Sequence, residues 1–113
     1  MFTVLLTRQA QKELTELPKL LQVATFQLIE ALERSGNELR EPVVRNLGNG
    51  LKELRATSKE GISRSFFFFT KGKNAYIVHI MQKKTQKTPK KTLELAYNRM
   101  DKLQKELKND QRS

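Results

Sequence analysis

Apolar residues recur at helical intervals in two stretches near the N-terminus, residues 9–17 and residues 19–34. The first stripe consists of Ala10, Leu14 and Leu17, and the second of Leu20, Leu21, Ala24, Leu28, Ala31 and Leu32. Thr7 is a favourable N-cap for the first helix, and Pro18 separates the two because proline fits only the first turn of a helix. The pattern therefore predicts a helical hairpin that ends at Gly36.

The rest of the apolar pattern up to residue 82 is typical of strands. The predicted strands are residues 2–6, 43–44, 51–55, 62–70 and 75–82. Short connections between the last strands favour an antiparallel meander. Phe66 to Phe69 are consecutive, so their side chains point to alternate faces of one strand. We therefore expect that strand to be central and covered on both faces.

A last helix is predicted after residue 87, with Thr88 as its N-cap and Pro89 in its first turn. Its apolar stripe consists of Leu93, Ala96, Met100, Leu103 and Leu107. The order of elements predicts an α+β fold. We expect a small antiparallel sheet of three to five strands, an N-terminal helical hairpin and a C-terminal helix, in one domain over residues 1–113.

Charge changes this picture, because the formal net charge of +10 is unevenly distributed along the 113 residues. Residues 1–60 carry nine Lys/Arg and eight Asp/Glu, whereas residues 61–93 carry eight Lys/Arg and no acid. A concentrated positive field favours a polyanionic partner, of which nucleic acid is the commonest, over a mixed surface that only maintains solubility. The chain has no cysteine, no stretch that could span a membrane and no recognisable signal peptide, so we expect a cytoplasmic protein.

Several enzyme classes are disfavoured by the residues available for catalysis. His79 is the one histidine, which excludes paired histidines and multi-histidine metal sites. The chain has no nucleotide-binding glycine motif and no serine-hydrolase motif. The basic region from residue 61 to residue 93 has no carboxylate for a two-metal nuclease. We therefore expect neither a metal nor a cofactor.

The remaining candidates are Arg64, His79 and a cluster of five lysines. These lysines are Lys83, Lys84, Lys87, Lys90 and Lys91. The arginine and the lysines suit metal-independent cleavage of RNA. In that reaction the ribose 2′-hydroxyl attacks the adjacent phosphorus, and negative charge gathers on the phosphoryl oxygens. An arginine fork stabilises such charge, and a lysine crowded by other cations is a candidate acid or base. Arg64 begins one strand and Lys83 and Lys84 follow the next, so an antiparallel pair brings them together.

Three segments resemble the RelE/HigB superfamily of bacterial toxins, most closely its phage-derived HigB-like branch. They are GLKELRA at residues 50–56, ISRSFFFF at residues 62–69 and VHIMQKKTQKTPKKTLELAYNRM at residues 78–100. The resemblance, which also includes the early LPKLL, covers nearly the whole chain in the right order. It implies a compact α+β toxin that cleaves mRNA on the ribosome. It also implies a helix-turn-helix antitoxin partner, with the toxin either monomeric or in a toxin–antitoxin complex.

The resemblance also assigns roles to residues. Arg64 matches the strand arginine that contacts the scissile phosphate, Lys83 and Lys84 match the basic pair after the last strand, and His79 matches a histidine frequent in the branch. The RNA-contact candidates are Lys87 and Lys90, which match basic positions, with Lys91 and Arg55 added from their positions in this chain. Some RelE members have a catalytic tyrosine near the position of Leu93, whereas Tyr97 lies one helical turn away, so the general base is unassigned.

Alternatives to this reading remain open at the level of sequence. Arg64 could simply pair with Glu53 or Glu60 across the sheet, and His79 could be a hydrogen-bonded structural residue. Two other functions fit a small basic domain. One is non-enzymatic inhibition of DNA gyrase, as in the related ParE branch, and the other is nucleic-acid binding without catalysis.

Overall fold

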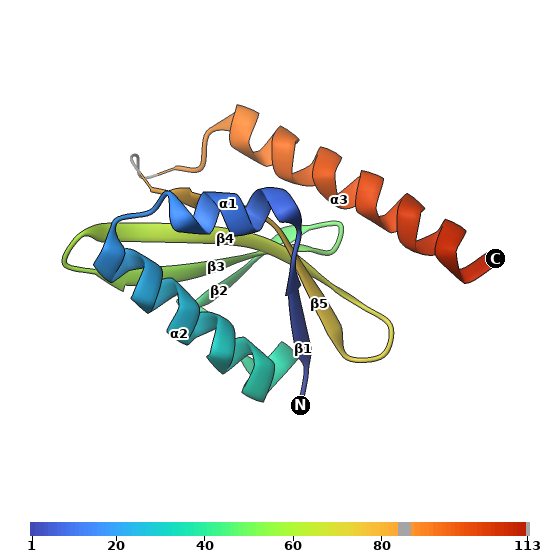
Figure 1. Ribbon diagram of the computed structural model, residues 1–113, viewed down its shortest axis with the longest axis horizontal. Helices are drawn as coiled ribbons and strands as arrows, with labels where there is room; N and C mark the ends of the chain where they lie inside the picture. Colours follow the sequence, from blue (N-terminus) through green and yellow to red (C-terminus); the bar gives the residue numbers. More distant parts are fainter. Residues whose placement is uncertain (84–86, 113) are drawn as a thin grey trace.

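The computed structural model describes residues 1–83 and 87–112. The elements are β1 (Thr3–Leu6), α1 (Arg8–Thr15), α2 (Lys19–Ser35), a 3₁₀ turn η1 (Gly36–Glu38), β2 (Val44–Gly48), β3 (Leu51–Ser58), β4 (Gly61–Thr70), β5 (Asn74–Gln82) and α3 (Lys90–Arg112). The predicted α+β class, with an N-terminal helical hairpin and a C-terminal helix, is confirmed (Figure 1). No helix in the described ranges has the length and apolar content needed to cross a bilayer.

The five strands form one sheet in the order β1-β5-β4-β3-β2. Strands β2 to β5 are the expected antiparallel meander. The expectation of a purely antiparallel sheet is wrong for β1, which pairs in parallel with β5, Thr3 opposite Asn74. The reason is that no tight turn links β1 to its neighbour. The helices and three other strands intervene, and such a long connection permits a parallel pairing.

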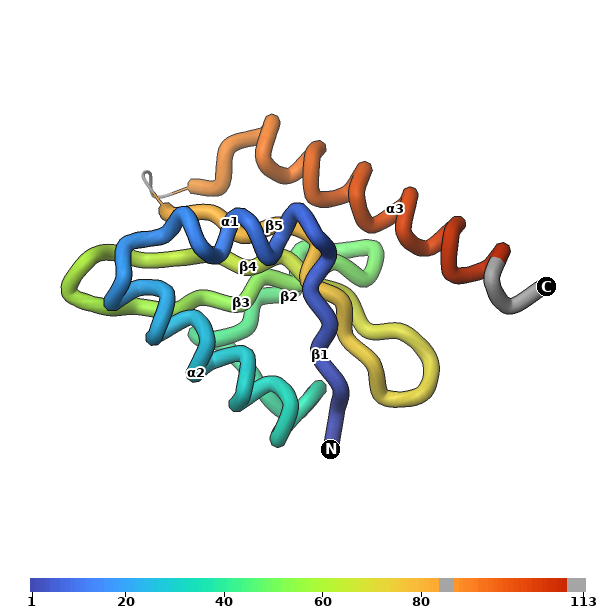
Figure 2. The backbone as a smooth tube through the Cα atoms, viewed as in Figure 1, coloured from blue at the N-terminus to red at the C-terminus, as the bar shows by residue number. Residues whose placement is uncertain are grey.

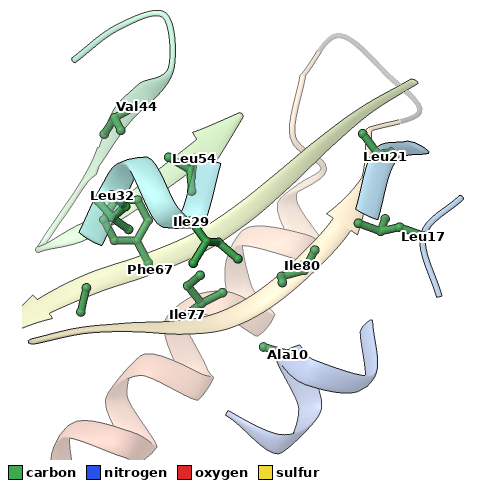
Figure 3. Packing of buried hydrophobic residues seen from close by; sticks show 11 residues of the cluster. Ala10, Leu17, Leu21, Ile29, Leu32, Val44, Leu54, Phe67, Ile77 and Ile80 are labelled. Atoms are coloured by element: carbon green, nitrogen blue, oxygen red, sulfur yellow. The ribbon is translucent and has the colours of Figure 1, made fainter. Parts of the chain in front are cut away.

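Helices cover both faces of the sheet (Figure 1). Phe67 packs with residues of α1 and α2, and Phe69 lies against the same cluster. Phe66 and Phe68 pack on the opposite face with Ala96 and Met100 of α3. The alternation expected for the four phenylalanines is therefore confirmed, and β4 is the central strand of the sheet. Figure 3 shows the α1–α2 side of the core, where Ile29 and Leu32 lie close to Phe67.

Two features predicted for the helices are corrected by their packing. Leu20 belongs to the predicted apolar stripe of α2 but is 52% exposed, whereas Thr25 and Ile29 are buried. Pro89, rather than the predicted Thr88, directly precedes α3, and its carbonyl accepts from the N–H groups of Thr92 at 3.0 Å and Leu93 at 3.2 Å. The Thr88 hydroxyl is used in the candidate site instead.

A bulge in β5 changes which residues reach each face of the sheet. Phe66 pairs with His79 and Phe67 pairs with Ile77, so β5 has one extra residue at this point. As a result both Ile77 and Ile80 point into the α1–α2 core, although they are an odd number of residues apart. The same shift lets His79 contact both α1 and α3.

Candidate nucleic-acid interface

Four basic residues gather around one carboxylate at one end of the sheet. We name this group the Glu53 cluster. It consists of Glu53, Arg45, Arg55, Arg64 and Lys83. Strand register assembles it, since Arg45 lies opposite Glu53 and Arg55 lies opposite Arg64. Lys83 follows the end of β5, where its N–H donates to the Ile62 carbonyl at 2.6 Å. The predicted approach of Arg64 and Lys83 from adjacent strands is confirmed.

Arg64 is buried at the centre of the cluster, with 1% of its surface exposed. Its Nε lies 3.7 Å from Oε2 of Glu53, and its Nη1 donates to the Thr88 hydroxyl. That hydroxyl in turn donates to Oε2 of Glu53 at 3.2 Å. Burial lowers the pKa of Arg64 against the raising effect of Glu53, and the charges of Arg55 and Arg45 lower it further.

Arg64 has an acidic neighbour, although its own segment of the sequence has none. Residues 61–93 do lack acids, but Glu53 comes from the neighbouring strand β3. Glu53 is itself 1% exposed. The pairing of Arg64 with Glu53, one of the two alternatives for the arginine, is therefore present. The sequence did contain a signal that an acid lies in this cluster. Side chains alternate between the two faces of a strand, and Glu53 and Arg55 are two residues apart on β3, so they share one face.

Arg55 and Lys83 form the more accessible part of the cluster. Nη2 of Arg55 lies 4.0 Å from Oε1 of Glu53, and its side chain is 32% exposed. Lys83 is half-buried. Partial burial lowers the pKa of Lys83, and the guanidinium charges of Arg55 and Arg64 lower it further. A lysine with a lowered pKa releases its proton more readily than a free one, which suits it to proton transfer.

The other predicted RNA-contact lysines lie beside the cluster on the chain segment that enters α3. Lys87, Lys90 and Lys91 are exposed, and the first two flank Thr88 and Pro89 in the sequence. Lys84, proposed with Lys83 as part of the catalytic pair, lies outside the described residues. Arg45 is also exposed. Sequence reasoning missed Arg45, because only the β2–β3 register brings it opposite Glu53.

His79 belongs to a second polar group rather than to the Glu53 cluster. Its Nδ1 donates to Oε2 of Glu13 at 3.0 Å, and its ring stacks on Phe66 with centroids 5.7 Å apart. Arg99 from α3 donates from Nη1 to both Glu13 oxygens at 3.0 Å and to the Val78 carbonyl at 2.9 Å. This environment of His79 fits the structural alternative for the histidine.

The Glu13 carboxylate is stabilised in its charged form by these contacts. Burial alone would raise the pKa of Glu13. Hydrogen bonds from His79 and from the Ile80 N–H, the charge of His79 and the hydrogen bond from Arg99 outweigh that effect and lower the pKa. The group therefore links α1, β5 and α3. Neither Glu13 nor Arg99 was predicted as a site residue, since they are 86 positions apart in the chain.

Tyr97 has a structural partner. Its hydroxyl lies 2.8 Å from the Leu47 carbonyl and 2.9 Å from the Gly48 carbonyl, to which it donates. These bonds fasten α3 to the end of β2. Leu93 packs against the core under α3. Among the side chains of residues 1–83 and 87–109, no group of three or more His, Asp or Glu is placed to hold a metal ion.

Comparison with known proteins places the chain in a family and shows which solved structures share its fold. The model of the family described as phage-derived protein Gp49-like (DUF891) matches residues 12–101. A search of curated proteins finds no match. Among solved structures, the toxin–antitoxin complex RelBE2 from Mycobacterium tuberculosis matches with a TM-score of 0.57 and 18% identity, over 73% of this chain and 98% of that chain.

A second solved structure is similar in extent. The archaeal RelE–RelB complex from Pyrococcus horikoshii matches with a TM-score of 0.55 and 25% identity, over 72% of this chain and 93% of that chain. Both matches take in nearly the whole of the solved chain, so most of the fold of this protein is shared with these structures. The chain belongs to the phage-derived Gp49-like family and has the fold of the RelE-like toxins.

Proposed function

We propose that this chain is the toxin of a toxin–antitoxin pair and that it cleaves mRNA on the ribosome without a metal ion. The observation that carries the proposal is the Glu53 cluster, in which Arg64, Arg55 and Lys83 surround one buried carboxylate. Exposed lysines at the start of α3 extend this positive surface towards a polyanion. The fold of the RelE-like toxins and the antitoxin-bound state of both solved relatives support the toxin–antitoxin assignment.

RNA binds, in this proposal, across the exposed members of the cluster and the lysines beside it. Arg55, Arg45 and Lys83 contact the phosphate backbone, with Lys87 and Lys90 beyond them. Arg64 is covered by Thr88 in the free chain, so the scissile phosphate must replace the Thr88 hydroxyl on the guanidinium. That exchange is favourable because a charge-assisted bond to phosphate is stronger than a bond to a neutral hydroxyl.

Cleavage then follows from the charges of the cluster. The ribose 2′-oxygen attacks the adjacent phosphorus and the bond from phosphorus to the 5′-oxygen breaks, which gives a 2′,3′-cyclic phosphate and a 5′-hydroxyl. Arg64 stabilises the charge that develops on the phosphoryl oxygens. The neutral fraction of Lys83 accepts the proton of the 2′-hydroxyl and returns it to the leaving 5′-oxygen, so the amine is regenerated. Glu53 orients both arginines.

Controlled expression followed by 5′-end mapping of cellular mRNA, with and without active ribosomes, tests the proposal. The wild-type chain should produce new 5′ ends in translated messages, and Arg64→Ala should remove them while the protein stays folded. Lys71→Ala is the matched control, because Lys71 is an exposed lysine of the same acid-free region in the β4–β5 turn. DNA supercoiling measured in the same cells separates cleavage from gyrase inhibition. A change in supercoiling with intact mRNA would refute the proposal.

A further inference from the structure

The outer face of α2 exposes large apolar side chains. Leu20, Val23 and Phe26 are 52%, 53% and 55% exposed. The helix lies at the periphery of the molecule, on the opposite side of the sheet from α3 (Figure 2). Apolar side chains that cluster on one exposed helix face, unlike single scattered ones, mark an interaction surface. This surface is separate from the Glu53 cluster, which lies under the start of α3.

The exposed residues form a regular line along the helix. We name the line formed by Lys19, Val23, Phe26 and Glu30 the α2 seam. The intervals are four, three and four residues, which is the alternating spacing of the contact positions in a coiled coil. All four residues are exposed, so the α2 seam faces away from the core. A helix packed side by side on α2 would meet these residues in order.

The α2 seam is complementary to itself when reversed. In an antiparallel pair with its twofold axis between residues 24 and 25, Val23 lies opposite Phe26 of the second copy, and Lys19 lies opposite Glu30. Gln22 lies opposite Gln27 of the second copy in the same way, beside the α2 seam. We propose that a second copy of this chain docks on α2, antiparallel, through these pairs. A groove of about 440 Å³, lined in part by Leu14 and Val23, can receive the Phe26 ring of the partner.

Electrostatics favour a second copy over a charged partner at this surface. The helical hairpin, residues 8–35, carries four Lys/Arg and four Asp/Glu, so it is neutral in a chain of charge +10. Neither Lys19 nor Glu30 forms an ion pair within the described part of the chain. The basic region lies elsewhere, and repulsion beyond roughly 8 Å is screened at physiological salt. A twofold interface forms two Lys19–Glu30 pairs at once.

Sedimentation equilibrium of the purified full-length chain tests the interface through reversed charges. The wild-type chain should show a monomer–dimer equilibrium. Lys19→Glu and Glu30→Lys should each raise the dissociation constant about tenfold or more, because two attractive pairs become repulsive. The double variant should regain the wild-type dissociation constant. An equimolar mixture of the two single variants should form a heterodimer, since every Glu then faces a Lys.

Replacement of exposed apolar residues by glutamate supplies a second comparison. Val23→Glu should abolish the dimer, whereas Leu95→Glu, which changes an exposed leucine on α3, should leave it intact. Circular dichroism checks that each variant is folded. A chain that stays monomeric at hundreds of micromolar would overturn the proposal. A dimer whose dissociation constant is unchanged by Lys19→Glu, Glu30→Lys and Val23→Glu would overturn it as well. The proposed RNA cleavage does not depend on this interface, so either result leaves the tests on Arg64 unaffected.

Discussion

The Arg64 guanidinium and the Glu53 carboxylate lie 3.7 Å apart, and both side chains are almost completely shielded from solvent. Either charge without its partner would lower the free energy of unfolding, because an unpaired buried charge is unfavourable. The pair therefore fixes the position of Arg64 in β4, and the other oxygen of Glu53 lies 4.0 Å from Arg55. Removing one partner should affect both the stability of the fold and the chemistry of the site.

Glu53→Gln removes the charge but keeps the shape of the side chain. We expect the free energy of unfolding to fall by about 3 kcal/mol, because Arg64 would keep its charge without its buried partner. The cleavage rate should fall as well, since the arginines lose their orientation. Urea denaturation and mRNA cleavage measure the two effects. Glu94→Gln, on the exposed side of α3, is the control and should change neither. An unchanged unfolding free energy for Glu53→Gln would contradict this account of the pair.

Lys83→Arg separates positive charge from proton transfer. Arginine stays protonated at every accessible pH, so it can bind phosphate but cannot exchange a proton. We expect RNA binding to be retained within about threefold and cleavage to fall by about 100-fold or more, the usual scale of general acid–base catalysis. Filter binding and cleavage assays give the two quantities, with Lys71→Arg as the control. Full cleavage activity in Lys83→Arg would exclude Lys83 from proton transfer.

Thr88→Val tests whether the threonine hydroxyl competes with the phosphate for Arg64. The variant loses the hydrogen bonds to Arg64 and Glu53, so the free energy of unfolding should fall by about 1 kcal/mol. KM for RNA should fall, because no hydroxyl has to be displaced, and kcat should stay the same. Steady-state cleavage of a ribosome-bound message measures both constants. The exposed Thr57→Val is the control. A higher KM would show that Thr88 assists RNA binding.

Tyr97→Phe tests the structural role of the α3 tyrosine. The substitution removes the hydroxyl that bonds to the Leu47 and Gly48 carbonyls. We expect a loss of about 1 kcal/mol in the free energy of unfolding, with cleavage per folded molecule unchanged. Thermal denaturation and a cleavage assay below the melting temperature are sufficient. A large loss of cleavage with unchanged stability would instead make Tyr97 part of the catalytic machinery.

Glu13 gives the fold an acid-sensitive link. Because its pKa is lowered below the usual value near 4.5, the carboxylate contributes stability above that pH, and this contribution is lost as the pH falls through the folded-state pKa. The stabilising groups that face it are His79, the Ile80 N–H and Arg99. Glu13→Gln should therefore lower stability at pH 7 and flatten its decline towards pH 3. Urea denaturation across this range measures the effect, with the exposed Glu106→Gln as the control. Parallel curves for wild type and Glu13→Gln would contradict it.

The sequence by itself determined the local elements and the charge pattern. Helical and alternating periodicities located the hairpin, the phenylalanine strand and the last helix, because these periods follow from backbone geometry within each segment. The meander followed from its short turns, so the proximity of Arg64 and Lys83 was predictable. The acid-free stretch from residue 61 to residue 93 predicted where a polyanion would bind.

Only the tertiary structure decided which distant residues meet. Glu53 reaches Arg64 through the register of β3 with β4, and Glu13 reaches Arg99 because α1 and α3 approach β5 from two sides. The parallel direction of β1 and the exposure of Leu20 likewise depend on how the helices pack on the sheet. Local periodicity carries no information on these pairings, since long-range register is set by the packing of the whole core.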